Sequence, residues 1–390
     1  MKTRLGSLVH EFREMRRFQA LRPADRIIVF YSEDAASWVH FAAIVRELTE
    51  VHGRRICYLT SDPNDPILNR HDSKVLPFCV GERGIRTFLF RALQAGVFVM
   101  TMPDLEAFHL KRSLHRVHYL YIFHSINSTH AVYLKSAFDH YDTIFCAGPH
   151  HMAEIRAMEK VYGLRGKTLV EHGYGRLDAL IASAGQSAPR PLPNGGRRVL
   201  VAPSWGPDGL LETPVGAELV EALLKVGHHV TVRPHPMTRR TAPQALDGLC
   251  ERFLANPCFQ YEEDVASQES LHRSHLMVSD WSGAATEYAF ALERPVLFVD
   301  TPRKIRNPEY EKVGLATIED FIRTEIGVVI APEDVRSAPE QIERLCADPE
   351  RFRRKMRECR SRWVYNVGRS GAVGAQYILD LAERLEKRSA

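Results

Sequence analysis

The sequence predicts an α/β protein of two doubly wound, parallel-sheet (Rossmann-like) domains that face each other across a cleft. Short apolar segments with the length of buried strands alternate with helical stretches in both halves of the chain, and this alternation is typical of βαβ units. A run rich in proline and glycine interrupts the pattern at residues 183–197, which indicates an interdomain linker. The length of 390 residues also suits two domains. We therefore expect an N-terminal domain over residues 1–182 and a C-terminal domain over residues 198–390.

The composition excludes several classes of protein. Hydrophobic residues make up 45% of the chain and charged residues 26%, which is typical of a folded soluble protein. The net charge is only +4, so a nucleic-acid partner is not expected. The seven cysteines are scattered without a C-x-x-C pair, which favours reduced thiols in the cytoplasm and argues against a structural zinc site. Because we find neither a bilayer-spanning apolar run nor a signal-peptide core, we expect a cytoplasmic protein.

Residues 1–22 form the first predicted element, a basic amphipathic helix. Its apolar residues recur at helical spacing, and arginines and lysine occupy much of the remaining surface. Such a helix can lie on an anionic membrane surface, which would place the protein at the inner face of the cell membrane. The alternative, which we prefer, is a helix packed on the core of the protein itself.

The rest of the N-terminal half alternates strands and helices. The histidine pair His150–His151 invites a metal interpretation, but adjacent histidines cannot chelate one ion comfortably from one helix face, so we interpret the pair as a helix start. Strands are expected at residues 26–31, 55–60, 75–80, 97–101, 119–123, 143–146 and 168–170, with helices at 35–50, 84–95, 129–138 and 150–162.

The C-terminal half repeats the alternation around one central unit, residues 277–300. An apolar strand runs into the small residues Ser282 and Gly283, which begin a helix, and a further strand follows Pro295. Free backbone N–H groups and the positive end of the helix dipole make this turn a natural phosphate site. The alternative is an ordinary turn that Ser282 caps. The other expected elements are strands at 198–202 and 229–233 and helices at 215–226 and 371–388, the last of which could cross back onto the N-terminal domain.

Polar residues follow the expected strands of the C-terminal half. Because ligands of doubly wound sheets bind beyond the carboxyl ends of the strands, these residues are candidates for binding a nucleotide donor. The basic ones could converge on one diphosphate together with the amides of the central turn. His235 lies between two prolines, and its alternative interpretation is a plain turn residue. The donor-side candidates are Ser204, Arg233, His235, Ser279, Asp280, Ser282, Gly283, Glu287, Arg303 and Lys304.

Two strand ends of the N-terminal half carry further candidates. His124 directly follows the strand at 119–123, where rigid backbone would present it to the cleft as a general base. The alternative is a histidine that only caps its turn. Ser125, Arg176 and Asp178 lie near the same strand ends, and we assign them to the acceptor side.

Taken together, these motifs resemble the CDP-glycerol glycerophosphotransferase family, which contains the teichoic-acid primases and polymerases. The resemblance covers roughly residues 115–375 and implies a GT-B fold that binds nucleotide in its C-terminal domain and acceptor in its N-terminal domain. It also implies transfer of a polyol phosphate from a CDP-activated donor onto a hydroxyl, with release of CMP. His124 then falls on the catalytic His-Gly of the family, with Ser125 in place of the glycine, and His235 falls on its His-Pro. The matching segments are residues 123–125, 173–178, 201–205, 233–236, 279–282 and 366–372.

The implied partners are a CDP-activated polyol, with glycerol as the expected polyol, and a glycan or lipid-linked acceptor of the cell envelope. We expect no metal or other cofactor, because no Asp-x-Asp pair follows a strand and basic groups could neutralise the diphosphate instead. A GT-B glycosyltransferase that uses a nucleotide sugar is the first alternative, with Glu287 reaching the ribose. A non-catalytic binding protein of the same fold is the second, although the presence of both His124 and His235 argues against it.

Overall fold

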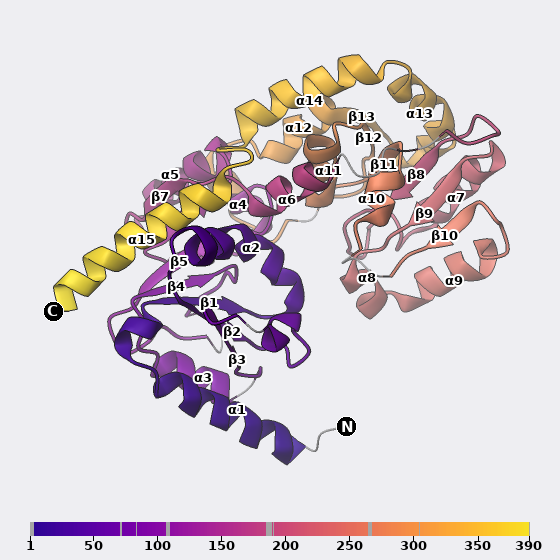
Figure 1. The fold of residues 1–390 in the computed structure, drawn as a ribbon. Coiled ribbons are helices and arrows are strands. Elements are labelled where there is room, and N and C mark those ends of the chain that lie inside the picture. The colour runs from indigo at the N-terminus through magenta and orange to yellow at the C-terminus, as the bar shows by residue number, and fades with distance from the viewer. Residues whose placement is uncertain are drawn as a thin grey trace.

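Two parallel β-sheets form the framework of the protein in the computed structural model, which describes residues 4–70, 72–82, 84–106, 110–184, 189, 191–263, 267–303 and 305–389 (Figure 1). The N-terminal sheet contains β1 (Ile28–Ser32), β2 (Ile56–Thr60), β3 (Val75–Cys79), β4 (Val97–Met100), β5 (His118–Ile122), β6 (Thr143–Cys146) and β7 (Thr168–Glu171), in the order β3-β2-β1-β4-β5-β6-β7. The C-terminal sheet contains β8 (Arg198–Val201), β9 (His229–Val232), β10 (Phe259–Tyr261), β11 (Leu276–Ser279), β12 (Val296–Val299) and β13 (Gly327–Ile330), in the order β10-β9-β8-β11-β12-β13.

Every strand pair among the described residues is parallel, so helices must make the crossovers and cover the faces of the sheets. The central strands are accordingly apolar on both faces, and β1 and β2 are buried along their whole length. In register, Val29 of β1 lies between Cys57 of β2 and Phe98 of β4. The carboxyl ends of the strands therefore line up along one edge of each sheet.

Eight of the described α-helices lie where the sequence predicts a helix, and seven others are not predicted. Those of the N-terminal half are α1 (Arg4–Gln19), α2 (Trp38–Arg46), α3 (Gly84–Arg91), α4 (Thr129–Val132), α5 (Pro149–Tyr162) and α6 (Gly175–Ser183). The C-terminal half adds α7 (Pro214–Lys225), α8 (Pro236–Thr241), α9 (Pro243–Phe253), α10 (Glu269–Arg273), α11 (Gly283–Leu292), α12 (Ile318–Ile326), α13 (Ala338–Cys346), α14 (Pro349–Trp363) and α15 (Ser370–Ser389). The helix expected at 129–138 is much shorter, because α4 ends at Val132 and Tyr133 is already extended.

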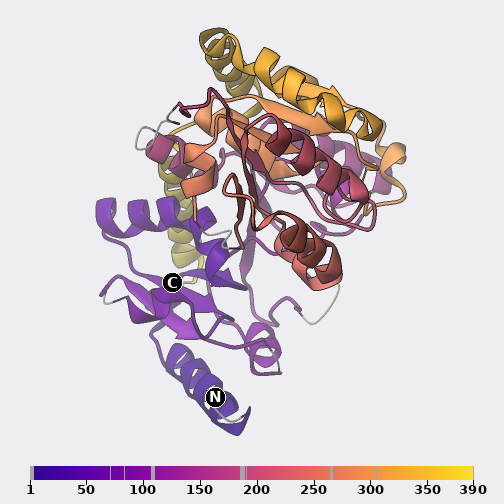
Figure 2. The same ribbon diagram turned by 90° about the vertical axis from the view of Figure 1, so that its right-hand side faces the viewer.

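The last helix crosses back between the two halves. Helix α15 packs against α2, and its Ala375, Ile378 and Leu379 join the same buried cluster as β1. The yellow helix accordingly extends from the C-terminal half along the N-terminal one (Figures 1 and 2). In the opposite direction, Leu177 and Leu180 of α6 join the cluster around α11. Helix α6 also packs against α2 and so contacts both halves, whereas α15 packs on the N-terminal half although it ends the C-terminal part of the chain.

The predicted linker is described only in part. Helix α6 continues to Ser183, and residues 191–197 lead into β8. Residues 185–188 and 190, which the linker prediction includes, lie outside the described residues.

The apolar stripe of helix α1 is buried in its second half and exposed in its first half. Met15 and Phe18 are buried, and the ring of Phe18 meets that of Phe78 on β3 at 5.5 Å. Leu8, Val9 and Phe12 instead have exposed fractions of 42%, 63% and 52%. The packed-helix interpretation therefore describes only the second half of α1. No helix among the described residues combines the length and the apolarity that crossing a bilayer requires.

Candidate active site

A pocket of about 380 Å³ opens between the two halves of the molecule. Its C-terminal wall includes Pro203 after β8, Arg233 to Pro236 after β9, Ser282 after β11, Leu271 of α10, and Ala284, Glu287, Tyr288 and Leu292 of α11. Its N-terminal wall comes from the segment after β1, from Ala35 to Val39, and from Arg176 and Leu180 of α6. The strand-end rule thus leads to one shared pocket, whose volume is in the range of small-molecule sites.

The first turn of α11 forms part of this pocket. Ser282 is the N-cap of the helix, and its Oγ accepts a weak hydrogen bond from the Ala284 amide at 3.4 Å. A Cβ on Gly283 would lie 2.5 Å from Oδ1 of Asn127, so the absence of a side chain at this position allows a loop of the N-terminal half to approach. The turn that is predicted to bind phosphate therefore lies at the rim of the pocket, where the Ala284 amide bonds the Ser282 hydroxyl and the Ala285 amide bonds the Ser282 carbonyl.

Two of the predicted donor residues lie beneath the pocket. The Ser279 hydroxyl donates to the Ala202 carbonyl at 2.9 Å, and Ser279 is fully buried. Asp280 is also fully buried and accepts hydrogen bonds from the amide and the hydroxyl of Ser204 at 2.7 and 3.0 Å. Burial raises the pKa of Asp280, while these hydrogen bonds act in the opposite direction. Asp280 therefore organises the loop after β8, and Ser279 joins that loop to β11.

The basic wall of the pocket contains Arg233 and His235. Arg233 has an exposed fraction of only 8%, and its Nη1 donates to the Ser270 hydroxyl at 3.3 Å. His235 caps α8, because its Nδ1 accepts a hydrogen bond from the Met237 amide at 3.1 Å. An accepting Nδ1 carries no proton, so Nε2 of this imidazole carries it. The ring also stacks on Trp205 with centroids 6.0 Å apart. His235 thus presents an N–H donor on the donor side.

His124 has the opposite tautomer. Its Nδ1 lies 3.0 Å from the carbonyl oxygen of Thr101. A carbonyl can only accept, so Nδ1 carries the proton and Nε2 is the basic nitrogen of the neutral ring. His124 is solvent-exposed and is not one of the residues that line the pocket, and the Tyr133 hydroxyl lies 3.5 Å from its Nε2. The protein groups around the ring lower the pKa of His124 by desolvation, although the Thr101 carbonyl and the charges of Glu287 and Asp34 act in the opposite direction. The ring is therefore neutral at pH 7.

A polar bridge connects His124 to α11. The Tyr174 hydroxyl lies 2.8 Å from the His124 carbonyl oxygen and 2.7 Å from Oε1 of Glu287. Arg176 completes the bridge with Nε at 2.7 Å from Oε2 of the same carboxylate. Glu287 raises the pKa of Arg176 further above its ordinary value, so the guanidinium stays charged. Arg176, predicted on the acceptor side, thus lies in the pocket wall against the C-terminal Glu287.

Other predicted residues do not reach the pocket. Arg303 donates to Asp320 at 2.8 Å and to the Thr317 hydroxyl, and so stabilises the start of α12. Asp178 accepts from the amides of Gly368 and Ser370 at 2.6 and 3.1 Å, which holds the N-terminus of α15. The Ser125 hydroxyl lies 3.4 Å from that of Tyr133. Lys304 lies outside the described residues.

Part of the N-terminal wall of the pocket is not predicted from the sequence. Trp38 and Val39 line the pocket, and the His40 ring stacks on Tyr174 at 5.8 Å. These residues follow β1, so the strand-end rule could have identified them, but their helical pattern led to a plain helix prediction at 35–50. Within the described ranges, no three His, Cys, Asp or Glu side chains come together to hold a metal ion.

Solved structures with a similar fold support the two-sheet architecture. A glycosyltransferase from Rickettsia africae ESF-5 aligns with a TM-score of 0.55 at 12% identity, over 93% of this chain and 98% of that chain. The UDP-GlcNAc 2-epimerase from Methanocaldococcus jannaschii, in complex with UDP-GlcNAc and UDP, aligns with a TM-score of 0.54 at 12% identity, over 91% of this chain and 99% of that chain. The S. aureus MnaA–UDP structure gives a TM-score of 0.54 at 11% identity, over 91% and 97%. The fold is therefore GT-B-like, as the sequence resemblance implied.

The sequence comparisons give the family. No curated protein matches the chain. The family model described as CDP-glycerol:poly(glycerophosphate) glycerophosphotransferase matches residues 99–370. This match covers more than half of the chain, from β4 to the start of α15, and includes every described residue of the pocket except those after β1. The chain therefore belongs to the CDP-glycerol:poly(glycerophosphate) glycerophosphotransferase family.

Proposed function

We propose that the protein transfers a polyol phosphate, glycerol phosphate in the first instance, from a CDP-activated donor to a hydroxyl of a cell-surface glycan or polymer, with release of CMP. The observation that carries this proposal is the pair of opposite histidine tautomers. His124 offers an unprotonated Nε2, which suits a general base, and His235 offers a protonated Nε2, which suits contact with an oxyanion. The family match supports the same class of transfer.

In the proposed reaction the acceptor hydroxyl oxygen attacks the phosphorus that bears the polyol. A bond forms between this oxygen and phosphorus, and the bond from phosphorus to the bridging oxygen of the diphosphate breaks, so that CMP leaves with the bonding electrons. Nε2 of His124 takes the hydroxyl proton as the new bond forms. The His235 N–H, Arg233 and the first turn of α11 stabilise the negative charge on the phosphoryl and leaving oxygens. In-line displacement requires this opposition of base and leaving group.

The donor residues have distinct proposed tasks. Arg233, His235, Ser282 and the Gly283 amide would bind the diphosphate, because all lie at the pocket or its rim. Glu287 would accept a further hydrogen bond from a ribose hydroxyl, in addition to those that Oε1 accepts from Tyr174 and Oε2 accepts from Arg176. Protein cations and amides then neutralise the diphosphate, so no metal or other cofactor is part of this proposal.

The exposed half of α1 supports a peripheral membrane contact at the cytoplasmic face. Leu8, Val9 and Phe12 are exposed together with Arg13 and Arg16, and these positions share one side of the helix. An apolar strip beside arginines fits the boundary between acyl chains and anionic headgroups. This contact would bring the pocket near lipid-linked acceptors.

A donor panel tests the proposed function. The purified protein is incubated with CDP-glycerol, CDP-ribitol and UDP-sugars, with and without acceptor, and release of CMP or of the uridine nucleotide is measured. We expect acceptor-dependent CMP release from a CDP-polyol. Turnover of a UDP-sugar alone would favour the glycosyltransferase alternative, and no turnover with any donor would favour the binding protein.

A further inference from the structure

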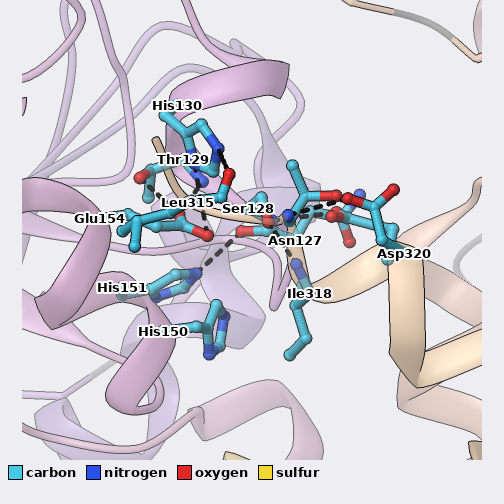
Figure 3. A network of polar contacts seen from close by, with 12 residues as sticks. Asn127, Ser128, Thr129, His130, His150, His151, Glu154, Leu315, Ile318 and Asp320 are labelled. Carbon is cyan, nitrogen blue, oxygen red and sulfur yellow. Dashed lines mark hydrogen bonds and ion pairs between the residues drawn. The ribbon is translucent and has the colours of Figure 1, made fainter. Parts of the chain in front are cut away.

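A buried polar network holds the loop that follows His124 (Figure 3). We call residues 126–132 the latch loop. Helix α5 of the same half supports it from one side. His150 donates from Nε2 to the Ile126 carbonyl at 2.8 Å, and His151 donates from Nε2 to the Asn127 carbonyl at 2.9 Å. Both histidines begin α5, as predicted, but their rings serve as donors to the loop backbone.

The other side of the latch loop contacts the C-terminal half. The Ser128 amide donates to Oε1 of Glu319 at 2.9 Å, and its hydroxyl accepts from the Ile318 amide at 2.8 Å. Nε2 of His130 donates to the Leu315 carbonyl at 3.1 Å, and the Asn307 amide side chain donates to the His130 carbonyl at 2.9 Å. These contacts join a loop adjacent to His124 directly to residues 307–319. The contacts to Ile318 and Glu319 connect the latch loop to α12 and must break if α12 moves away from this loop, whereas the segment Tyr310–Val313 itself packs on α4 and α5.

His130 and Glu154 form the central pair of this network. They have exposed fractions of 0% and 2%, and Nδ1 of His130 lies 3.5 Å from Oε1 of Glu154. Oε2 of Glu154 already accepts from the amide and the hydroxyl of Thr129 at 2.5 and 2.7 Å. Neither Nδ1 nor Oε1 has a hydrogen-bond partner elsewhere in the described part of the chain.

One proton must lie between the two facing atoms. Because Nε2 of His130 donates to a carbonyl, a neutral ring would direct its Nδ1 lone pair at an ionised carboxylate. Either the ring is an imidazolium or Glu154 is protonated, and in both cases the pair as a whole is neutral. Loss of the proton would leave an unpaired charge in a buried site, which is strongly unfavourable.

We propose that the His130–Glu154 pair is a proton-dependent latch that holds the latch loop against the C-terminal half and thereby positions His124 opposite the donor. His130 and Glu154 are positioning residues, since they act through the loop and not on the substrate. The link to catalysis rests on the proposed function, whereas the latch itself does not.

The direction of the pH effect follows from the surroundings of the pair. Burial acts to lower the pKa of His130, but the hydrogen bond and charge of Glu154, the Leu315 carbonyl and the charge of Glu319 outweigh it, so the pKa is raised. The other groups nearby are the Tyr310 ring, 6.3 Å from the His130 ring, and His150, whose pKa burial lowers. A raised pKa in the closed protein means that the latch is fully effective below the ordinary pKa of about 6.5. Its contribution is lost as pH rises through the raised value.

Hydrogen-exchange protection of the latch loop tests the proposal without an activity assay. In the full-length protein we expect the protection factors of peptides spanning residues 124–133 to fall by up to about tenfold per pH unit between pH 6.5 and the raised pKa. Glu154→Gln should remove this dependence, because its amide NH₂ can donate to a neutral His130 while its oxygen still accepts from Thr129. His150→Gln is the matched control and should keep the slope of the native protein, because His150 is a neutral donor to the same loop.

Kinetics then connect the latch to the reaction. His130→Ala should lower kcat by about tenfold or more with a smaller change in the KM for donor, while Glu154→Gln keeps kcat near the native value and loses its decline at alkaline pH. A pH-independent protection of residues 124–133 in the native protein, or an unchanged slope in Glu154→Gln, would overturn the latch. If the protection of residues 124–133 shows the expected pH dependence but no CDP-polyol is turned over, the proposed function is refuted and the latch proposal is retained.

Discussion

Replacement of His124 by glutamine should remove the base and leave the pocket in place. A glutamine amide can still donate to the Thr101 carbonyl, which His124 contacts at 3.0 Å, but it has no basic nitrogen to receive a proton. We expect kcat to fall by about 10²–10⁴-fold, the usual contribution of a general base. This corresponds to about 3–5 kcal/mol of activation free energy. Donor affinity should stay nearly unchanged, because Arg233 and His235 line the pocket and His124 does not.

The pH dependence of kcat/KM is an independent test of His124 as the base. His124 must be neutral to accept a proton, and desolvation lowers its pKa below the ordinary value. On the acid side of the pH profile, kcat/KM should therefore rise with pH through a value below about 6.5 and be constant by pH 7. This rise should vanish in His124→Gln, while the alkaline decline that belongs to the His130–Glu154 pair should remain.

The assay is CMP release in single turnover with CDP-glycerol and acceptor, and His118→Gln is the matched control. His118 begins strand β5, the strand that precedes His124, and its Nε2 contacts the Thr143 hydroxyl at 2.9 Å, away from the pocket. It should keep near-native turnover. If His124→Gln also did so, the base would lie elsewhere. Glu171 would then be the next candidate, because burial lowers the pKa of His172 to about 4 and Asp178 holds α15.

Three further predictions concern the donor side and α1. His235→Ala should weaken CDP binding in calorimetry as well as lower kcat, since it removes an N–H donor from the pocket; a loss confined to kcat would contradict this role. Ser282→Pro removes the hydroxyl cap and one amide N–H at the start of α11 and should reduce CDP-glycerol affinity by about tenfold, a change of about 1.4 kcal/mol; unchanged affinity would exclude the amide site. A double change of Leu8 and Phe12 to serine should lower co-sedimentation with anionic liposomes without lowering the melting temperature, because both side chains are exposed. Intact liposome binding would remove α1 from the membrane contact.

The parts of the fold that the sequence predicts well are those with local signals. Strand β6 has the predicted bounds because an apolar run ends at a turn containing Gly148 and Pro149. Strand β13 was missed because it follows α12 without an intervening turn signal, and β10 because three residues on a sheet edge are too short for a pattern. Segments after residue 300 lack strong alternation, so α12 to α14 were not predicted.

The candidate site likewise contains residues that local sequence signals indicate and residues that they do not. His235 and Ser282 follow strand ends and line the pocket, as the rule for parallel sheets predicts, whereas His124 follows β5 but is not one of the lining residues. Long or charged side chains instead form hydrogen bonds and ion pairs with groups that are distant in the sequence. Arg303 pairs with Asp320, and Asp178 binds the start of α15, nearly two hundred residues away. The buried pair of His130 and Glu154 is equally invisible in sequence, because neither spacing nor periodicity indicates that the two side chains meet.

A structure of the protein with CDP-glycerol bound tests the central claim most directly. The measurement is the position of the phosphorus that carries glycerol, relative to the two imidazole rings. We expect the diphosphate at the first turn of α11, with a phosphoryl or bridging oxygen within hydrogen-bond distance of Nε2 of His235. We expect the phosphorus to face Nε2 of His124 across the space for an acceptor hydroxyl. A diphosphate bound outside this pocket, or a glycerol-bearing phosphorus that faces away from His124, would contradict it.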